Sequence, residues 1–98
     1  MKASRNKTID ISVEEGRDLI TEKFGRVDIL LNNAGTGANV RSVDETEEGW
    51  DKVISLNLNS CFFFSQKIAK EFMIPQKGGK IVNMSSLSAF IGVPNAVA

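Results

Sequence analysis

A short run rich in branched apolar residues, at positions 27–31, lies between two stretches of helical periodicity and constrains the fold more than any other feature. Its length and composition are typical of a strand buried on both faces of a parallel sheet. Residues 80–85 have the same character, and residues 7–11 resemble the end of a further strand. Strands that alternate with helices of ten or more residues need crossover connections, so they run parallel. We therefore expect an α/β fold with about three strands and two to three helices.

The first predicted helix has clear start and stop signals. Ser12 is a predicted N-cap, and Glu15, three residues later, forms the second half of a capping box. The helix is expected to end near Phe24, with Gly25 as its C-terminal cap.

The second predicted helix is long and apolar almost all round. Thr46 is its expected cap, and apolar residues recur at helical spacing from Trp50 to Met73. Pro75, together with Gly78-Gly79, is expected to end the helix. The three consecutive Phe residues at 62–64 make the helix apolar in nearly every direction. Such a helix is expected to pack against a sheet on one side and against another subunit on the other.

The composition bounds the class of protein. The 98 residues fit one domain, placed at residues 1–98. Twelve basic and twelve acidic side chains cancel, which argues against nucleic-acid and anionic-membrane partners, and no apolar run is long enough to span a membrane. The chain has no His and a single Cys, Cys61, which is interpreted as a small buried hydrophobe. We therefore predict no metal site and, from the lone thiol, a cytoplasmic location.

The sequence Asn32-Asn33-Ala34-Gly35 directly follows the central strand. Ligands of parallel sheets bind at the carboxyl ends of the strands, and glycine there lets a flat ligand approach the backbone. The two Asn side chains can satisfy backbone groups where neighbouring strands diverge. The competing interpretation is an ordinary turn, because Asn and Gly are common turn residues.

Other polar residues lie at positions where a ligand or a partner is expected. Asp10 ends the first strand, although a solvated aspartate is the plainer interpretation. Asn57 lies within the second helix and needs a hydrogen-bond partner, which a neighbouring helix could supply. Ser85 and Ser86 end the last strand, and strand register decides which of them faces a ligand.

Three ordered segments resemble those of the short-chain dehydrogenase/reductase family at that family's spacings. They are residues 25–35, 50–58 and 80–86, and the resemblance extends from about Asp10 to Ala98. It implies part of a Rossmann-type, doubly wound parallel sheet. It also implies an NAD(P)-dependent oxidoreductase that interconverts a secondary alcohol and a carbonyl. The implied partners are a small alcohol or carbonyl substrate and further copies of the chain, in a dimer or tetramer formed through the long helix.

The resemblance assigns cofactor contacts to individual residues. The Asp10 carboxylate would accept from the adenine amino group, beside the backbone amide of Ile11. Asn32, Ala34 and Gly35 would shape the adenosine side of the groove for NAD or NADP.

The resemblance also assigns the catalytic contacts. Ser86 matches the serine that hydrogen-bonds the substrate oxygen, and family spacing favours it over Ser85. Asn57 matches the asparagine that helps to hold a water molecule in a proton relay.

Two parts of the family pattern have no counterpart in these 98 residues. No glycine-rich turn precedes Asp10, and the family's tyrosine falls at the position directly after Ala98, in a chain without any Tyr. General acid–base catalysis typically contributes ~10²–10⁴-fold, so the isolated chain is predicted to be inactive. The strand at residues 7–11 would also lack its sheet neighbours, and the apolar flank of residues 27–31 would be exposed. The alternative function is therefore non-catalytic. The chain would act as an assembly or regulatory partner that binds full-length relatives through its apolar helix.

Overall fold

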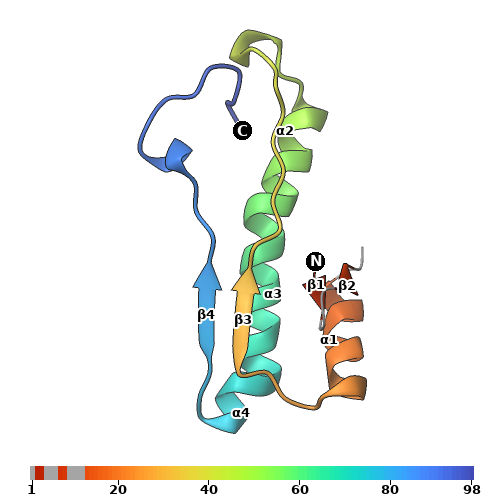
Figure 1. Cartoon of the computed structure of the whole chain (residues 1–98). Helices are drawn as coiled ribbons and strands as arrows, with labels where there is room; N and C mark the ends of the chain where they lie inside the picture. Colours follow the sequence, from red (N-terminus) through yellow and green to blue (C-terminus); the bar gives the residue numbers. More distant parts are fainter. Residues whose placement is uncertain (1, 4–6, 9–12) are drawn as a thin grey trace.

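The computed structural model of the chain describes residues 2–3, 7–8 and 13–98 (Figure 1). Strands β3 (Ile29–Asn32) and β4 (Lys80–Asn83) form a parallel pair, with Asn32 opposite Asn83. A continuous helical rod connects them. It consists of α2 (Glu47–Ile54), η2 (Ser55–Asn59), α3 (Ser60–Ile68), η3 (Ala69–Met73) and α4 (Ile74–Gln76). This strand–helix–strand unit confirms the predicted parallel crossover.

The amino-terminal strand lies in a sheet apart from β3 and β4, in line with the expectation that it lacks its sheet neighbours, but its antiparallel pairing was not predicted. β2 (Lys7–Thr8) pairs antiparallel with β1 (Lys2–Ala3), in a small sheet separate from β3 and β4. An antiparallel partner that is close in the chain needs only a short connection, whereas a parallel partner needs a crossover. The pairing of β2 with the nearby β1 is therefore favoured. The predicted ligand residues Asp10 and Ile11, and the predicted cap Ser12, lie outside the described residues.

The helix ends follow the predicted cap chemistry. α1 (Val13–Lys23) is closed by Gly25, whose φ is 72° and whose N–H donates to the Ile20 carbonyl at 3.0 Å. At the start of α2, the Thr46 hydroxyl accepts from the Gly49 N–H at 3.0 Å. At the far end of the rod, the left-handed position is occupied by Lys77, with φ 60°, instead of by a glycine.

Two segments of the rod, η2 and η3, are π-helical. In η2 the Ser60 hydroxyl donates to the Ser55 carbonyl at 2.8 Å. Each π turn accommodates one residue more than an α turn. The periodicity of the sequence predicted one regular helix and did not reveal these two interruptions.

The core lies between the rod, β3 and α1. Leu30 of β3 packs against one side of the rod, and Ile20 and Val27 pack around this contact. Ile68 is fully buried, with 0% of its surface exposed. The rod contributes most of the core (Phe64, Ile68, Phe72 and Met73). One side of the predicted apolar helix is thus buried by the sheet, as expected.

The sheet is covered on one face only, which corrects the expectation of a strand buried on both faces. Leu30 is 9% exposed, whereas its neighbours Ile29 and Leu31 are 65% and 55% exposed. Val82 and Met84 of the β4 segment are exposed as well. Successive strand residues face opposite sides, and the described residues supply a helical layer on the Leu30 side alone.

Two polar contacts fix the rod along β3. The Gln76 side-chain amide accepts from the Val27 N–H at 2.9 Å and donates to the Val27 carbonyl at 2.8 Å. Further along, Asn32 Nδ2 donates to the Ser65 hydroxyl at 2.8 Å. The helix rises about 16 Å between Ser65 and Gln76, and the strand segment covers about 16 Å between Val27 and Asn32. The two spans match, so both contacts form at once.

The segment after β4 continues beyond the end of the sheet and then bends towards α2 (Figure 1). It contains the short helix η4 (Leu87–Ala89), and it meets the loop before η1 (Ser42–Asp44) at a parallel bridge between Val40 and Ala96. The Val40 N–H donates to the Asn95 carbonyl at 3.1 Å. Across the part of the chain that the structure describes, no helix is both long and apolar enough to cross a membrane.

Candidate active site

β3 and β4 end at the same edge of the sheet, and a loop leaves each of them there (Figure 1). The last bond of the pair joins the Met84 N–H to the Asn32 carbonyl at 3.1 Å. The carboxyl edge of a parallel sheet is where such folds bind ligands. The structure therefore brings the predicted segment from Asn32 to Gly35 and the predicted Ser86 to one edge.

Asn57 holds the loop after β3. Its Oδ1 accepts from the Thr36 N–H at 2.8 Å, and its Nδ2 donates to the Thr36 carbonyl at 2.7 Å. A side chain on Gly35 would meet Asn57, because an added Cβ would lie 3.4 Å from Oδ1. The partner of Asn57 is thus a loop backbone and not a second helix. Its part in a proton relay stays a prediction.

Four polar side chains near this edge are joined by hydrogen bonds: Asn32, Ser65, Asn83 and Cys61. Asn32 Nδ2 donates both to Ser65 Oγ and to Asn83 Oδ1, at 2.8 Å each. The half-buried Cys61 thiol donates to Asn83 Oδ1 at 3.5 Å. Asn32 therefore ties two strands to the rod. Its predicted place in the cofactor groove is a separate role that stays a prediction.

Sequence reasoning missed Ser65 and Asn83, although a signal for each was present. Asn83 lies in one of the segments that carried the resemblance, three residues before the predicted catalytic serine, and it pairs in register with Asn32. Ser65 interrupts the apolar stripe of the rod. A polar residue on a face that otherwise packs against a sheet requires a partner there.

Ser86 begins the turn beyond β4. Its backbone is extended, with φ −141° and ψ 156°, and its Oγ accepts from the Ser88 N–H at 3.2 Å. This contact uses the hydroxyl as an acceptor and leaves its hydrogen available for a substrate oxygen. Ser86, and not Ser85, caps η4.

Ala34 and Gly35 lie in the exposed part of the loop after β3. Ala34 has only a methyl group and Gly35 has no side chain, so the backbone is open to solvent here, and its contact with a flat ligand stays a prediction. The predicted place of Asn32, Ala34 and Gly35 on the adenosine side of a cofactor groove stays a prediction. The side assigned to Asp10 and Ile11 lies outside the described residues.

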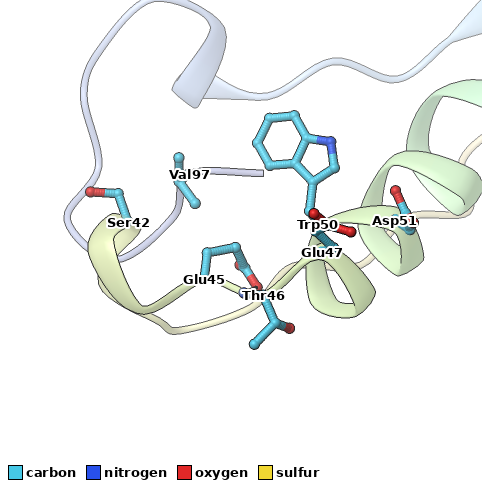
Figure 2. A pocket seen from close by; sticks show the side chains of 7 residues that line it. All are labelled: Ser42, Glu45, Thr46, Glu47, Trp50, Asp51 and Val97. Carbon is cyan, nitrogen blue, oxygen red and sulfur yellow. Dashed lines mark hydrogen bonds between the residues drawn. The ribbon is translucent and has the colours of Figure 1, made fainter.

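Two cavities lie elsewhere, beside the start of α2. The larger, of about 370 Å³, is lined by Trp50, Val97 and three carboxylate side chains, Glu45, Glu47 and Asp51 (Figure 2). The smaller, of about 300 Å³, includes Thr36 in its lining and so adjoins the loop that Asn57 holds. Neither is lined by Ser86 or Asn57. We assign the candidate site to the sheet edge because its polar groups converge there.

The chemical groups at this edge are hydroxyls, amides and one thiol. Within residues 2–3, 7–8 and 13–98, no three His, Cys, Asp or Glu side chains lie close enough to hold a metal ion. The sequence contains no His and no Tyr. These residues can orient an oxygen atom or hold a water molecule.

A family model described as short chain dehydrogenase matches residues 7–98. The chain belongs to the short-chain dehydrogenase family. Its α/β unit is accordingly part of the Rossmann-type fold, and the resemblance found in the sequence is confirmed.

Relatives of this short-chain dehydrogenase chain include enzymes of known reaction. It is 42% identical over 89 residues to 2-dehydro-3-deoxy-D-gluconate 5-dehydrogenase of Dickeya dadantii, covering 87% of this chain and 35% of the relative. It is 38% identical to a 3-oxoacyl-(acyl-carrier-protein) reductase of Thermotoga maritima, covering 91% of this chain and 36% of that enzyme. The chain therefore spans about a third of the length of these relatives.

A solved structure of a related enzyme closely resembles the structure of this chain. It is a gluconate 5-dehydrogenase from Burkholderia cenocepacia in complex with NADP and tartrate, with a TM-score of 0.78 and 28% identity. The match covers 87% of this chain and 33% of that enzyme.

Proposed function

We propose that this chain supplies the central part of an NAD(P)-dependent oxidoreductase that interconverts a secondary alcohol and a carbonyl. The observation that carries the proposal is the convergence of Ser86 and the Asn57-held loop at the carboxyl edge of β3 and β4. The relatives are dehydrogenases and reductases, and one structural neighbour binds NADP. Both findings support the same reaction class.

In this proposal the chain's own residues orient the reactants. Ala34 and Gly35 would leave the backbone open to the adenosine part of NAD or NADP, beside Asp10 and Ile11. Ser86 would donate its hydroxyl hydrogen to the substrate oxygen, where charge develops as the carbonyl is reduced. The nicotinamide, when bound, would exchange a hydride with the substrate carbon.

A segment exchange tests the reaction. The homologous segment of the Dickeya dadantii dehydrogenase would be replaced by residues 13–98 of this chain, and turnover would be measured with NADH and NADPH. We expect the chimera to be active and the isolated 98-residue chain to be inactive. Ser86→Ala should lower kcat of the chimera by roughly 10²–10³-fold, the usual cost of a lost oxyanion donor.

The Ser85→Ala chimera is the matched control, since it removes a neighbouring hydroxyl. It should retain most of its activity. A large loss with Ser85→Ala and none with Ser86→Ala would assign the substrate contact to Ser85. If neither change affects an active chimera, the proposed role of this edge is wrong.

We further propose that the whole protein forms a dimer or tetramer through its rod and works in the cytoplasm. Leu58 and Phe62, one helical turn apart, are both exposed, as is Phe63. The rings of Phe62 and Phe63 meet edge to face with centroids 5.3 Å apart. This side of the rod faces away from the β3–β4 sheet and supports an interface.

The same surface favours the second candidate function, a non-catalytic assembly or regulatory partner. The two functions separate in a direct test on the natural protein, by intact mass together with titration of NADH and NADPH. Binding of a reduced cofactor supports the enzyme. No binding at millimolar cofactor, with association that is lost in a Phe62→Ser variant, supports the assembly partner.

A further inference from the structure

Strand β4 receives little help from apolar packing. None of its four residues is buried, and Ile81, on the same face as Leu30, is 40% exposed. Backbone bonds hold β4 to β3, but they do not fix its distance from the rod. Another contact must set where the end of β4 lies relative to the helix.

Asn83 makes that contact. It is the last residue of β4, and its Oδ1 accepts from Asn32 Nδ2 at 2.8 Å and from the Cys61 thiol at 3.5 Å. The other hydrogen of Asn32 Nδ2 goes to the Ser65 hydroxyl. The end of β4 is therefore joined to β3 through one donor and to α3 through another. Both bonds use Asn83 as an acceptor.

The path from Asn83 to Ser86 is short. Three residues of nearly extended chain span at most about 10 Å. Met84 is still tied to Asn32 by a backbone bond at 3.1 Å, and Ser86 itself is extended. A displacement of Asn83 is consequently passed on to Ser86 with little slack.

We propose that Asn83 is a positioning residue for Ser86, acting as the acceptor that fixes the end of β4 against the rod. The inference rests on the proposed function for its catalytic meaning, since Ser86 is there the substrate contact. Asn83 itself does not touch the reactants.

The test uses the full 98-residue chain and two probes. The amide resonances of Ser86 and Ser88 report the position of the turn, because the Ser88 N–H donates to Ser86 Oγ. The alkylation rate of Cys61, the single cysteine, reports the bond to Asn83. Asn83→Leu should shift both amide resonances and raise the alkylation rate several-fold.

The conservative variant makes the test specific. Asn83→Asp keeps the acceptor oxygens, so it should return the Ser86 and Ser88 resonances and the alkylation rate close to those of the natural chain. Asn39→Leu, a change at an exposed loop asparagine, should leave both unaltered. The proposal is overturned if Asn83→Leu leaves the two amides in place, or if Asn83→Asp shifts them as much as Asn83→Leu does. If Asn83→Leu does not fold, the Asn83→Asp result decides alone.

Turnover of the chimera separates this proposal from the proposed function. Asn83→Leu should lower kcat by roughly 10-fold or more, because small misplacements of a positioned group are costly. KM for the cofactor should stay unchanged, and Asn83→Asp should recover the rate. If Ser86→Ala has no effect on turnover, the proposed function fails, while the resonances still decide whether Asn83 positions the turn.

Discussion

Side-chain amides act in this chain as substitutes for a neighbouring strand. Asn57 and Gln76 each pair with both backbone groups of a single residue, Thr36 and Val27 respectively. The two contacts flank β3, which among the described residues has a single strand beside it. An amide matches a peptide group in its donor and acceptor, so it can satisfy the backbone where no strand is present.

The Asn57 contact leads to a stability prediction. Asn57→Ala removes two hydrogen bonds and should destabilise the chain by about 1–2 kcal/mol, as measured by urea unfolding. Asn59→Ala is the control, since Asn59 is an exposed residue of the same π segment. That change should be neutral or slightly stabilising, because Ala has the higher helix propensity. Equal effects of the two substitutions would contradict the holding role of Asn57.

The pair formed by Arg26 and Asp28 gives a pH-dependent prediction. The hydrogen bond from the Arg26 guanidinium lowers the pKa of the Asp28 carboxyl below its ordinary value of 3.8. A lowered pKa in the folded state means that the stabilisation is full above pH 3.8 and is lost as the pH falls through the folded value. Carboxyl ¹³C titration should give an Asp28 pKa below 3.8 in the natural chain and closer to 3.8 in Arg26→Gln. Both side chains are exposed, so salt should weaken the shift.

At the scale of elements, the turn that ends the rod contains a residue in an unfavourable conformation. Lys77 has φ 60° and ψ 33°, and the Gly78 N–H donates to the Met73 carbonyl at 3.0 Å. Left-handed backbone favours glycine over lysine, so Lys77→Gly should stabilise the chain by about 0.5–1 kcal/mol. Thermal or urea unfolding measures the change. A loss of stability would mean that the Lys77 side chain makes a compensating contact.

The two glycines that follow Lys77 should respond differently to the same substitution. A Cβ on Gly79 would lie 2.5 Å from Met73 Cγ, within the core, whereas a Cβ on Gly78 meets nothing within 4 Å. Gly79→Ala should therefore destabilise the chain by about 1–3 kcal/mol, the usual cost of overpacking. Gly78→Ala is the matched control and should have a small effect in the same unfolding experiment.

The elements that local chemistry specifies were predictable from the sequence. Thr46 and Gly25 cap helices in the structure because a single side chain, or a single glycine conformation, decides each boundary. The strands around Leu30 and Ile81 were predictable from their apolar runs. The pairing of residues 7–8 was not, because it depends on which partner strands are available.

The candidate site was predictable only in part. The family resemblance indicated Ser86 and Asn57, and the structure brings their elements to one edge of the sheet. The sequence did not indicate that Thr36 would be the partner of Asn57, or that Asn83 would accept a hydrogen bond from Asn32. Contacts of this type depend on the register of the strands and on the rotation of the helix about its axis. Residue spacing and periodicity in a single sequence do not reveal either of these.

At the scale of the whole molecule, the two faces of the sheet differ sharply. Leu30 faces the rod and is buried, whereas Ile29, Leu31, Val82 and Met84 lie exposed. Parallel sheets in α/β proteins are covered on both faces. An apolar face of this size is expected to promote association or to bind apolar dyes.

This asymmetry predicts that substitutions at two adjacent leucines change the stability by very different amounts. Leu30→Ala should destabilise the chain by about 2–5 kcal/mol, the range for buried leucines. Leu31→Ala should cost much less, because most of that side chain is already in water. Leu31→Thr should also weaken concentration-dependent association, measured by sedimentation velocity. An equal loss of stability at both positions would mean that a partner covers the exposed face in solution.

Because the rod contains π turns, the number of residues between its two contacts with the loop and strand segment is fixed. Between Asn57, which holds Thr36, and Gln76, which holds Val27, the rod includes the whole of η3. Deleting one residue there would rotate everything beyond it by about 100°, so that Asn57 and Gln76 could not both reach their partners. Homologous rods of different length should therefore carry their insertions and deletions before Asn57 or after Gln76. A one-residue gap between these two positions in an alignment would mark the gain or loss of a π turn.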